Sequence, residues 1–167
     1  SWDTRRYAYW SVFAGAFGHT FGDNAIMQFF NKERETKGAF SVWQDWREAL
    51  HNIGAMQMAH LKNLMESVDY QNGSAAQHLL AGEEGEKYDR ISVFAGEDYI
   101  FCYDYSGRPF ALDLTEDTGS FDAYWMDPVT GAYSYFGTAN GGEQAEYTPV
   151  KRLEGHSDWV LALRRKA

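Results

Sequence analysis

Cysteine and clustered basic residues are scarce in this chain, and each scarcity excludes a class of structure or partner. Cys102 is the single cysteine among 167 residues, so no disulfide can form within the chain. Its place between Phe101 and Tyr103 predicts a buried, inert thiol. Lysine and arginine number 15 against 24 acidic residues, a formal charge of −9, and the longest basic run is residues 164–166. Because affinity for a phosphate backbone comes from clustered cations, we expect no nucleic-acid partner.

The chain also lacks long apolar runs and the common short catalytic motifs. No apolar run is long enough to cross a bilayer, which predicts no membrane insertion. The sequence has no G-x-S-x-G elbow, no His-Glu-x-x-His pair, no cysteine cluster and no phosphate-cradling glycine loop before a helix. His51, His60 and His78 are irregularly spaced on amphipathic or linker segments. We therefore expect neither a metal site nor a cofactor.

Aromatic residues, in contrast, are abundant: they make up 17% of the chain, with 6 Trp, 11 Tyr and 11 Phe. Such residues either fill β-sheet cores or form platforms for flat ligands such as sugar rings. Many lie in residues 3–17, where Asp3 and Thr4 predict a helix start, Gly18 predicts its end, and apolar side chains occupy every face. A helix of this kind needs burial on all sides. The chain is therefore predicted to be the end of a larger protein.

Three less regular segments follow that helix. The glycine-punctuated residues 18–22 predict a short buried strand, and residues 24–30 predict an apolar segment that is helical or irregular. Residues 31–41 are polar and are predicted to be a solvated loop with no special function.

Two helices and a linker complete the first half. Residues 43–50 predict a short helix, and residues 54–67 predict a longer one, whose apolar side chains recur every three to four positions on one face. Residues 69–85 have the composition of a linker, with a short apolar stretch at Leu79 and Leu80. We place the domain boundary at the start of this linker.

Beyond the linker the hydrophobic pattern changes to a period of two, which predicts an antiparallel β-sandwich. Ser106 and Gly107 predict a tight hairpin, and residues 127–131 predict a second reversal. The aromatic strand at residues 99–105 is predicted to be central, with the sandwich core on one face and the helical part on the other. The predicted strands are residues 91–95, 99–105, 110–114, 121–126, 133–136, 145–148 and 159–163.

His19 is the first candidate for a functional residue. A histidine in a glycine-punctuated stretch at the end of a buried strand is placed where α/β folds put ligand groups; the alternative is a structural histidine bonded to a backbone carbonyl. Phe21 and Asp23 follow, so a ring, an imidazole and a carboxylate are expected to converge.

A catalytic carboxylate pair is not expected in this chain. Hydrolysis of a glycosidic bond usually takes two carboxyl groups about 5 to 9.5 Å apart. Only Asp23 lies beside the predicted buried strand, and the acidic cluster of Glu83, Glu84 and Glu86 lies in the linker without apolar walls. We therefore assign no catalytic residue.

Six motifs in the same order resemble the C-terminal portion of the apiosidase-like glycoside hydrolases. They are RRYAYWSVFAGAFGHTFGDNAIMQFF, WREAL, GAMQMAHLKNLMES, GRPFALDL, WMDPVTG and DWVLAL, and they cover nearly all of the chain. The resemblance implies an α+β fold, namely the C-terminal remnant of a (β/α)8 barrel in residues 1–68, followed by a linker and an antiparallel β-sandwich in residues 69–167. It also implies a bacterial protein in an extracytoplasmic location, periplasmic or secreted.

The resemblance further assigns the parts of the barrel. Residues 2–17 would be the seventh barrel helix, residues 18–21 the eighth strand and residues 43–67 the eighth helical layer. Residues after a barrel strand face the active site, so the implied partners are a carbohydrate substrate and the rest of the same barrel. The implied substrate-binding residues are His19, Thr20, Phe21, Asp23 and Asn24.

Two other roles stay open at this point. The sandwich is alternatively a non-catalytic module that binds carbohydrate or collagen through an exposed row of Trp125, Tyr124, Tyr133 and Tyr135, although alternation in a half-buried strand favours a core position for Trp125. A purely structural role, in which the sandwich braces the barrel, is compatible with the first interpretation.

Overall fold

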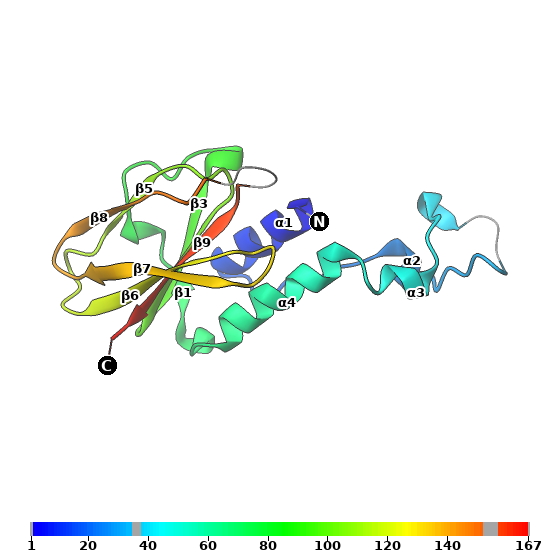
Figure 1. Ribbon diagram of the computed structural model, residues 1–167, viewed down its shortest axis with the longest axis horizontal. Helices are drawn as coiled ribbons and strands as arrows, with labels where there is room; N and C mark the ends of the chain where they lie inside the picture. The colour runs from blue at the N-terminus through cyan, green and yellow to red at the C-terminus, as the bar shows by residue number, and fades with distance from the viewer. Residues whose placement is uncertain (1, 35–37, 152–156, 167) are drawn as a thin grey trace.

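The computed structural model describes residues 2–34, 38–151 and 157–166 and places helices and sheets in adjoining parts (Figure 1). The helical elements are α1 (Trp2–Phe13), α2 (Asn24–Met27), η1 (Ala39–Ser41), α3 (Trp46–Ala49), α4 (Ile53–Glu66), η2 (Tyr70–Asn72), η3 (Gln77–Leu79) and η4 (Lys87–Asp89). The strands are β1 (Ser74–Ala75), β2 (Leu80–Ala81), β3 (Ile91–Gly96), β4 (Tyr99–Asp104), β5 (Phe110–Asp113), β6 (Ser120–Met126), β7 (Tyr133–Asn140), β8 (Gln144–Tyr147) and β9 (Trp159–Arg165).

Two antiparallel sheets form the second half, as the period-two pattern predicted. One has the strand order β1-β3-β4-β9-β6-β7 and the other β2-β5-β8. Each of the seven predicted strands is present, with ends shifted by a few residues at most except for β7, which continues to Asn140. The fold is therefore mixed α and β with a sandwich, and the described residues close no barrel.

Strand β4 is central and buried along its whole length, which confirms the prediction for residues 99–105. Ile100 and Cys102 enter the core between the two sheets. Tyr99, Phe101 and Tyr103 point to the opposite face and pack with α1 and α4 in a second core. The six-stranded sheet is therefore covered on both faces, by the smaller sheet and by the helices.

Helix α1 is shorter than predicted, and one of its faces is open. It ends at Phe13, because Gly15 adopts φ +93° and the amide of Ala16 donates to the Ser11 carbonyl at 3.0 Å, a Schellman ending. Ala8, Tyr9 and Phe13 are buried, whereas Tyr7 is exposed and Phe17 lies fully in solvent beyond the helix. Within the chain one face of this segment packs and another is open, and burial on all sides inside a larger protein stays a prediction.

A buried ion pair joins the helices to the sandwich. Arg5 of α1 donates to both carboxylate oxygens of Asp158, just before β9, at 2.9 and 3.0 Å, and also to Gln57 of α4. The Tyr103 hydroxyl of β4 donates to the same carboxylate at 3.1 Å. Arg5 and Asp158 are both fully buried. Separating the helices from the sheet would break this pair and leave an uncompensated buried charge, which is strongly destabilising. The cluster therefore holds α1 and α4 against the sheet.

The predicted strand at residues 18–22 is not observed, and the predicted linker at residues 69–85 contains two short strands. The structure assigns no strand to residues 18–22, and Gly18, His19 and Thr20 are exposed. A lone extended segment has no hydrogen-bonding neighbour, and the described residues supply none there. In the linker, β1 pairs with β3 and β2 pairs with β5, so this segment contributes an edge strand to each sheet.

The turn at Ser106 and Gly107 is a crossover and not the predicted hairpin. Oδ1 of Asp104 accepts the amides of Ser106 and Gly107, each at 3.1 Å, and Gly107 adopts φ +73°. The chain then enters β5, which belongs to the other sheet. The reversal at residues 127–131 does join the paired strands β6 and β7, which confirms that prediction.

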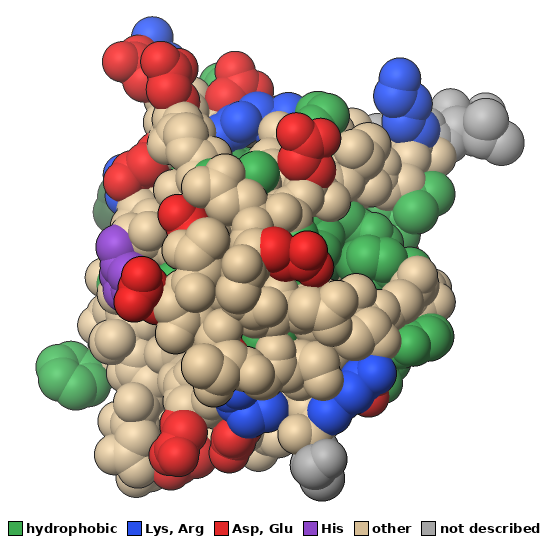
Figure 2. Space-filling model, turned by 90° about the vertical axis from the view of Figure 1, so that its left-hand side faces the viewer, with side chains coloured by type: hydrophobic (Ala, Val, Ile, Leu, Met, Phe, Trp, Pro, Cys, Tyr) green, Lys and Arg blue, Asp and Glu red, His purple; other side chains and the backbone are tan. Residues whose placement is uncertain are grey.

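The helical part projects away from the sandwich. Helix α4 leads from the sheets to α2 and α3, which lie at its far end (Figure 1). Its buried side chains include Leu61, Leu64 and Met65, so the predicted apolar face is confirmed. At the opposite end of the molecule, acidic side chains are scattered over the visible face of the sandwich, and the described basic side chains form no continuous patch there (Figure 2).

Candidate functional site

The candidate site is a cavity of about 370 Å³ in the projecting part. Two stretches of chain form its walls, one before and within α2, the other around η1 and up to α3. The lining residues are Phe21, Gly22, Asp23, Asn24, Ala25, Phe40, Ser41, Val42, Trp43 and Gln44.

The first wall is organised by Asp23. This residue has extended backbone geometry, so it begins α2, and its Oδ1 accepts the Ala25 amide at 2.9 Å. Its Oδ2 accepts the Asn52 side-chain amide at 2.8 Å. Asn52 in turn exchanges two hydrogen bonds of 3.1 Å with Gln44. The Asp23 carboxylate is therefore held in one orientation by the backbone and by a pair of amides from the second wall.

The ring of Phe21 lies against the first turn of α4. Gly54 in that turn is buried, and a Cβ atom placed there would lie 3.4 Å from the Phe21 ring, at van der Waals contact. Phe21 is half-buried and presents part of its surface to the cavity.

The second wall is a tight turn held by Gln28. The Gln28 side chain accepts the Ala39 amide at 2.9 Å and donates to the Ala39 carbonyl at 3.2 Å, as a backbone partner would. Phe40 and Ser41 then adopt φ values of +54° and +59°. The left-handed region is costly for residues other than glycine, and such strain persists only where the surroundings impose it. The turn leaves Phe40 87% and Trp43 77% exposed beside the cavity.

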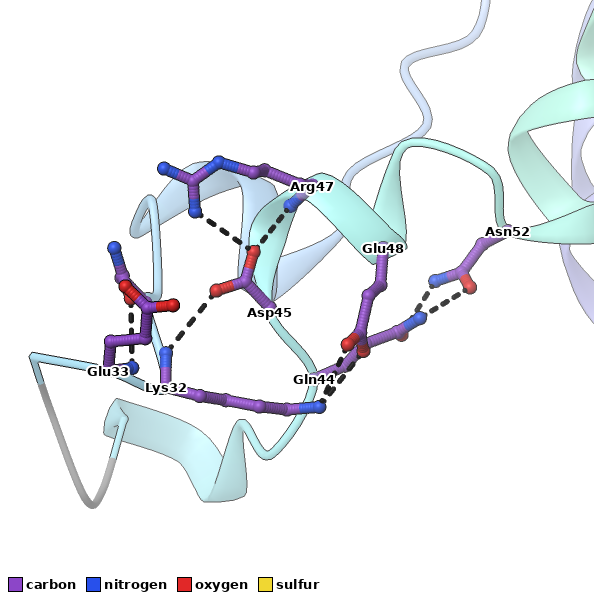
Figure 3. Close-up of polar contacts among 8 residues, drawn as sticks. Lys32, Glu33, Gln44, Asp45, Arg47, Glu48 and Asn52 are labelled. Carbon is purple, nitrogen blue, oxygen red and sulfur yellow. Dashed lines mark hydrogen bonds and ion pairs between the residues drawn. The ribbon is translucent and has the colours of Figure 1, made fainter.

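Paired charges lie around α3, next to Gln44 of this wall (Figure 3). Asp45 begins α3 by accepting the Arg47 amide at 3.0 Å, and it also accepts the Lys32 amide at 3.3 Å. The hydrogen bond from the Arg47 backbone holds the pKa of the Asp45 carboxyl below its usual range. The ammonium of Lys32 pairs with Glu48 at 2.9 Å. Lys32 and Arg47 therefore both have acidic partners.

Comparison with known proteins decides the family. Residues 1–72 match the model described as "Apiosidase-like, catalytic domain", and residues 75–164 match "Putative collagen-binding domain of a collagenase". Over residues 75–164, more than half of its length, the chain belongs to the family of putative collagen-binding domains, and its residues 1–72 are similar to the apiosidase-like catalytic domain. The comparison with curated proteins found no match.

Two solved structures are similar to this chain over 98% of its length. One, titled "Glycoside hydrolase", is 38% identical with a TM-score of 0.86. The other, a glycoside hydrolase family 5 protein from Bacteroides vulgatus ATCC 8482, is 35% identical with a TM-score of 0.83. The chain covers 36% and 35% of those two proteins, so it spans about a third of their length.

The structure brings together three of the five residues that the sequence singled out in this chain. Phe21, Asp23 and Asn24 line the cavity. His19 instead lines a different hollow of about 710 Å³ between the end of α1, α4 and β1, and exposed Thr20 lines neither. Within the described residues the ring and the carboxylate therefore lie at one hollow and the imidazole at another.

Sequence reasoning missed the second wall. Residues 31–41 were expected to be a solvated loop without function, yet Phe40 and Ser41 line the cavity together with Val42, Trp43 and Gln44; residues 35–37 lie outside the described part. The signal was an aromatic pair, Phe40 and Trp43, spaced three apart at the end of a charged stretch.

The cavity can bind a polar ligand, and its lining holds a single carboxylate. Asp23 is the one acidic residue among the described side chains of the lining, and none of these is a lysine or arginine. The exposed rings offer apolar contact, while Asp23, Asn24 and Gln44 offer hydrogen-bonding groups. Across the described residues, no cluster of histidine, cysteine or acidic side chains could hold a metal ion, and no helix is long and apolar enough to cross a membrane.

Proposed function

We propose that this chain is the C-terminal segment of a glycoside hydrolase that acts on complex polysaccharide. In this proposal residues 1–68 are the last helix, strand and helix of a (β/α)8 barrel and contribute the wall after the eighth strand to the sugar pocket. Residues 69–167 are the linker and an accessory β-sandwich. The family matches and the chain's coverage of about a third of its solved relatives support this assignment.

The observation that carries the proposal is an open apolar surface on the helical part. Monomeric proteins rarely expose large contiguous apolar patches unless those patches contact something. We infer that the remaining strands and helices of the barrel cover this surface and would extend residues 18–21 into a paired strand. Apart from Phe40 and Trp43, which border the cavity, the exposed large hydrophobic side chains of this part are Tyr7, Phe17, Met27, Phe29, Leu50, Ile53 and Met56.

The catalytic carboxylates belong, in this proposal, to the part of the barrel outside the chain. Asp23 is the acidic residue of the cavity, and both of its oxygens accept hydrogen bonds that fix the wall. A retaining or inverting glycosidase needs a second carboxyl at a defined distance. We therefore assign Asp23 to substrate binding with Phe21 and Asn24, place His19 and Thr20 beside them in the complete barrel, and expect the isolated chain to be inactive.

The proposal is tested by comparing the isolated chain with the full-length protein on aryl glycosides and pectic oligosaccharides. We expect turnover by the full-length protein and none by the chain alone. A sharper version adds the separately produced remainder of the barrel to the chain, which should restore turnover if Phe17 and Met56 meet that remainder. Hydrolysis by the isolated chain at a rate near that of the full-length protein would refute the assignment.

A second candidate is a non-catalytic module that binds carbohydrate or collagen through the sandwich. The family description of residues 75–164 favours it, and Tyr133 and Tyr135 on β7 are 42% and 58% exposed. Trp125, which the sequence offered as part of the platform, is only 4% exposed and packs between the sheets. Binding to a glycan array or to collagen that is lost in Tyr135→Ala, with the fold intact by circular dichroism, would favour this candidate.

The family resemblance also supports an extracytoplasmic location in a bacterium. Cell fractionation of the native host, with detection by an antibody against the sandwich, tests that location directly.

A further inference from the structure

We propose that Phe40 and Trp43 form an aromatic lip that binds a neutral sugar ring at the mouth of the cavity, with Asp23 and Gln44 as hydrogen-bonding partners. This inference rests on the proposed function, since it names the substrate class of the same pocket. It adds a binding role for Phe40, which lies in residues 31–41, a segment that the sequence predicted to be a loop with no special function.

The exposure of the two rings is the first argument. Phe40 and Trp43 are 87% and 77% exposed although they border a cavity whose other side chains are partly polar. A sugar ring has an apolar face of C–H groups and an edge of hydroxyl groups. Stacking would remove the apolar faces of both partners from water, while the hydroxyl edge reaches Asp23 and Gln44.

The backbone of the lip is the second argument. Phe40 and Ser41 are consecutive left-handed residues, and neither is glycine. The turn keeps this shape because Gln28 holds both polar groups of Ala39, and because Gly38 packs where a Cβ would lie 2.8 Å from that of Val42. Strain that the surroundings maintain at an exposed ring is typical of binding sites. A ring needed only for folding would gain nothing from this placement.

The charges around the cavity select a neutral ligand. Asp23 is the one charged side chain among the described residues of the lining. The cations Lys32 and Arg47, which lie around α3, are engaged with Glu48 and Asp45. A uronate would place its carboxylate near Asp23, and the described lining offers no cation to offset the repulsion, so neutral sugars should bind better than acidic ones.

The lip is tested by ligand titration of the ¹⁵N-labelled chain, read at the indole N–H signals of its tryptophans. The neutral probes are cellohexaose, xylohexaose and arabinohexaose, and the acidic probe is hexagalacturonate. We expect at least one neutral probe to shift the Trp43 signal, which Trp43→Phe identifies. Trp43→Ala should weaken binding about tenfold, because the stacking area of one ring is lost, whereas Trp43→Phe should weaken it less.

Two further variants separate binding from folding. Phe40→Gly relieves the left-handed strain and removes the ring, so the melting temperature should stay or rise while the affinity falls. Tyr88→Ala removes an exposed ring of η4, which belongs to neither proposed binding surface, and should leave the titration unchanged. Binding equal to wild type in Trp43→Ala, a preference for hexagalacturonate, or no shift of Trp43 with any neutral probe would overturn the lip.

The full-length protein distinguishes failure of the lip from failure of the proposed function. If it hydrolyses polysaccharide and Trp43→Ala leaves KM unchanged, the lip is refuted and the proposed function stands. If it hydrolyses nothing while the chain binds neutral oligosaccharides through Trp43, the lip stands and the proposed function fails.

Discussion

The helical part and the sandwich differ in how far they bury their aromatic side chains. In the sandwich, Phe121 is fully buried and Trp125 is nearly so between two sheets. In the helical part, Phe17, Phe40 and Trp43 are among the most exposed side chains of the chain. Helix α1 shows the change within one segment, since Phe13 is buried against the sheet and Phe17 is in solvent. An aromatic content of 17% therefore serves two purposes: it forms a core in one part and presents contact surface in the other.

Replacing Phe13 and Phe17 singly by alanine gives the largest contrast. Phe13→Ala should lower the free energy of unfolding by about 3–5 kcal/mol, because it opens a cavity among Phe94, Phe101 and Tyr9. Phe17→Ala should change it by less than about 0.5 kcal/mol, since an exposed ring loses no packing. Urea unfolding followed by circular dichroism measures both values. Equal losses in the two variants would mean that Phe17 packs in this chain and would remove the contrast.

Arg5→Met tests whether the two parts unfold together. The variant should cost about 3 kcal/mol, because it leaves the fully buried carboxylate of Asp158 without its cation. Lys62→Met, at the exposed ion pair with Glu66, is the matched control and should cost less than about 1 kcal/mol. The helical and sheet signals should shift to the same lower denaturant concentration in Arg5→Met. A shift of the helical signal alone would show that the sandwich is stable by itself.

Asp104 makes the sandwich sensitive to pH. Burial raises the pKa of this carboxyl from 3.8 to about 6, although hydrogen bonds from the Gly107 and Ser106 amides oppose the rise. One of its buried oxygens, Oδ2, has no hydrogen-bond partner among the described residues. A raised folded-state pKa stabilises the fold below the unfolded-state value of 3.8, and that stabilisation is lost as pH rises through about 6.

Asp104→Asn should therefore be more stable than wild type at pH 8, by up to about 3 kcal/mol, and similar to it below pH 4. Urea unfolding of both proteins from pH 4 to pH 8 measures the difference. Asp113→Asn is a useful control, because hydrogen bonds from Thr115 lower the pKa of that carboxyl and should give the opposite sign. A constant difference across the range would rule out titration of Asp104 as the cause.

Arg6→Lys gives the smallest expected effect and tests the contact between α1 and the sandwich. The Arg6 guanidinium lies 4.6–5.4 Å from the ring centroids of Tyr7, Trp10, Tyr88 and Tyr105. A lysine keeps the charge and loses the planar stacking, so the loss should be about 1 kcal/mol. Thermal unfolding monitored by tryptophan fluorescence detects it. An unchanged stability in Arg6→Lys together with a clear loss of stability in Tyr88→Ala would show that packing of the rings, and not the guanidinium, stabilises this contact.

The sequence predicted the regular elements of this fold better than their connections. The seven strands and α4 are where the periods of two and 3.6 residues place them, because each period records which side chains face the core. The turn at Ser106 and Gly107 was predicted as a hairpin and is a crossover between sheets. A hairpin and a crossover between sheets favour the same residues in the turn, so only the pairing of distant strands distinguishes one from the other.

The candidate site was predicted in part for a similar reason. Phe21 and Asp23 are close together in the chain, and a local argument found them, whereas Asn24 was implied by the family resemblance. Phe40 and Trp43 reach the same cavity through Gln28 and through the pairing of Gln44 with Asn52. Contacts between side chains 8 to 11 positions apart in irregular segments leave no periodic pattern to recognise.

By itself the sequence determined the classes of element, the doubly covered strand β4, the single buried cysteine and the family. These follow from local periodicity, composition and motif order, which are properties of neighbouring residues. Tertiary structure alone decided that Arg5 and Asp158 meet in the interior, that the linker supplies edge strands, and that His19 and Phe21 face different hollows. Each of these depends on the free energy of bringing together groups far apart in the chain, and that free energy is set only when the whole fold is formed.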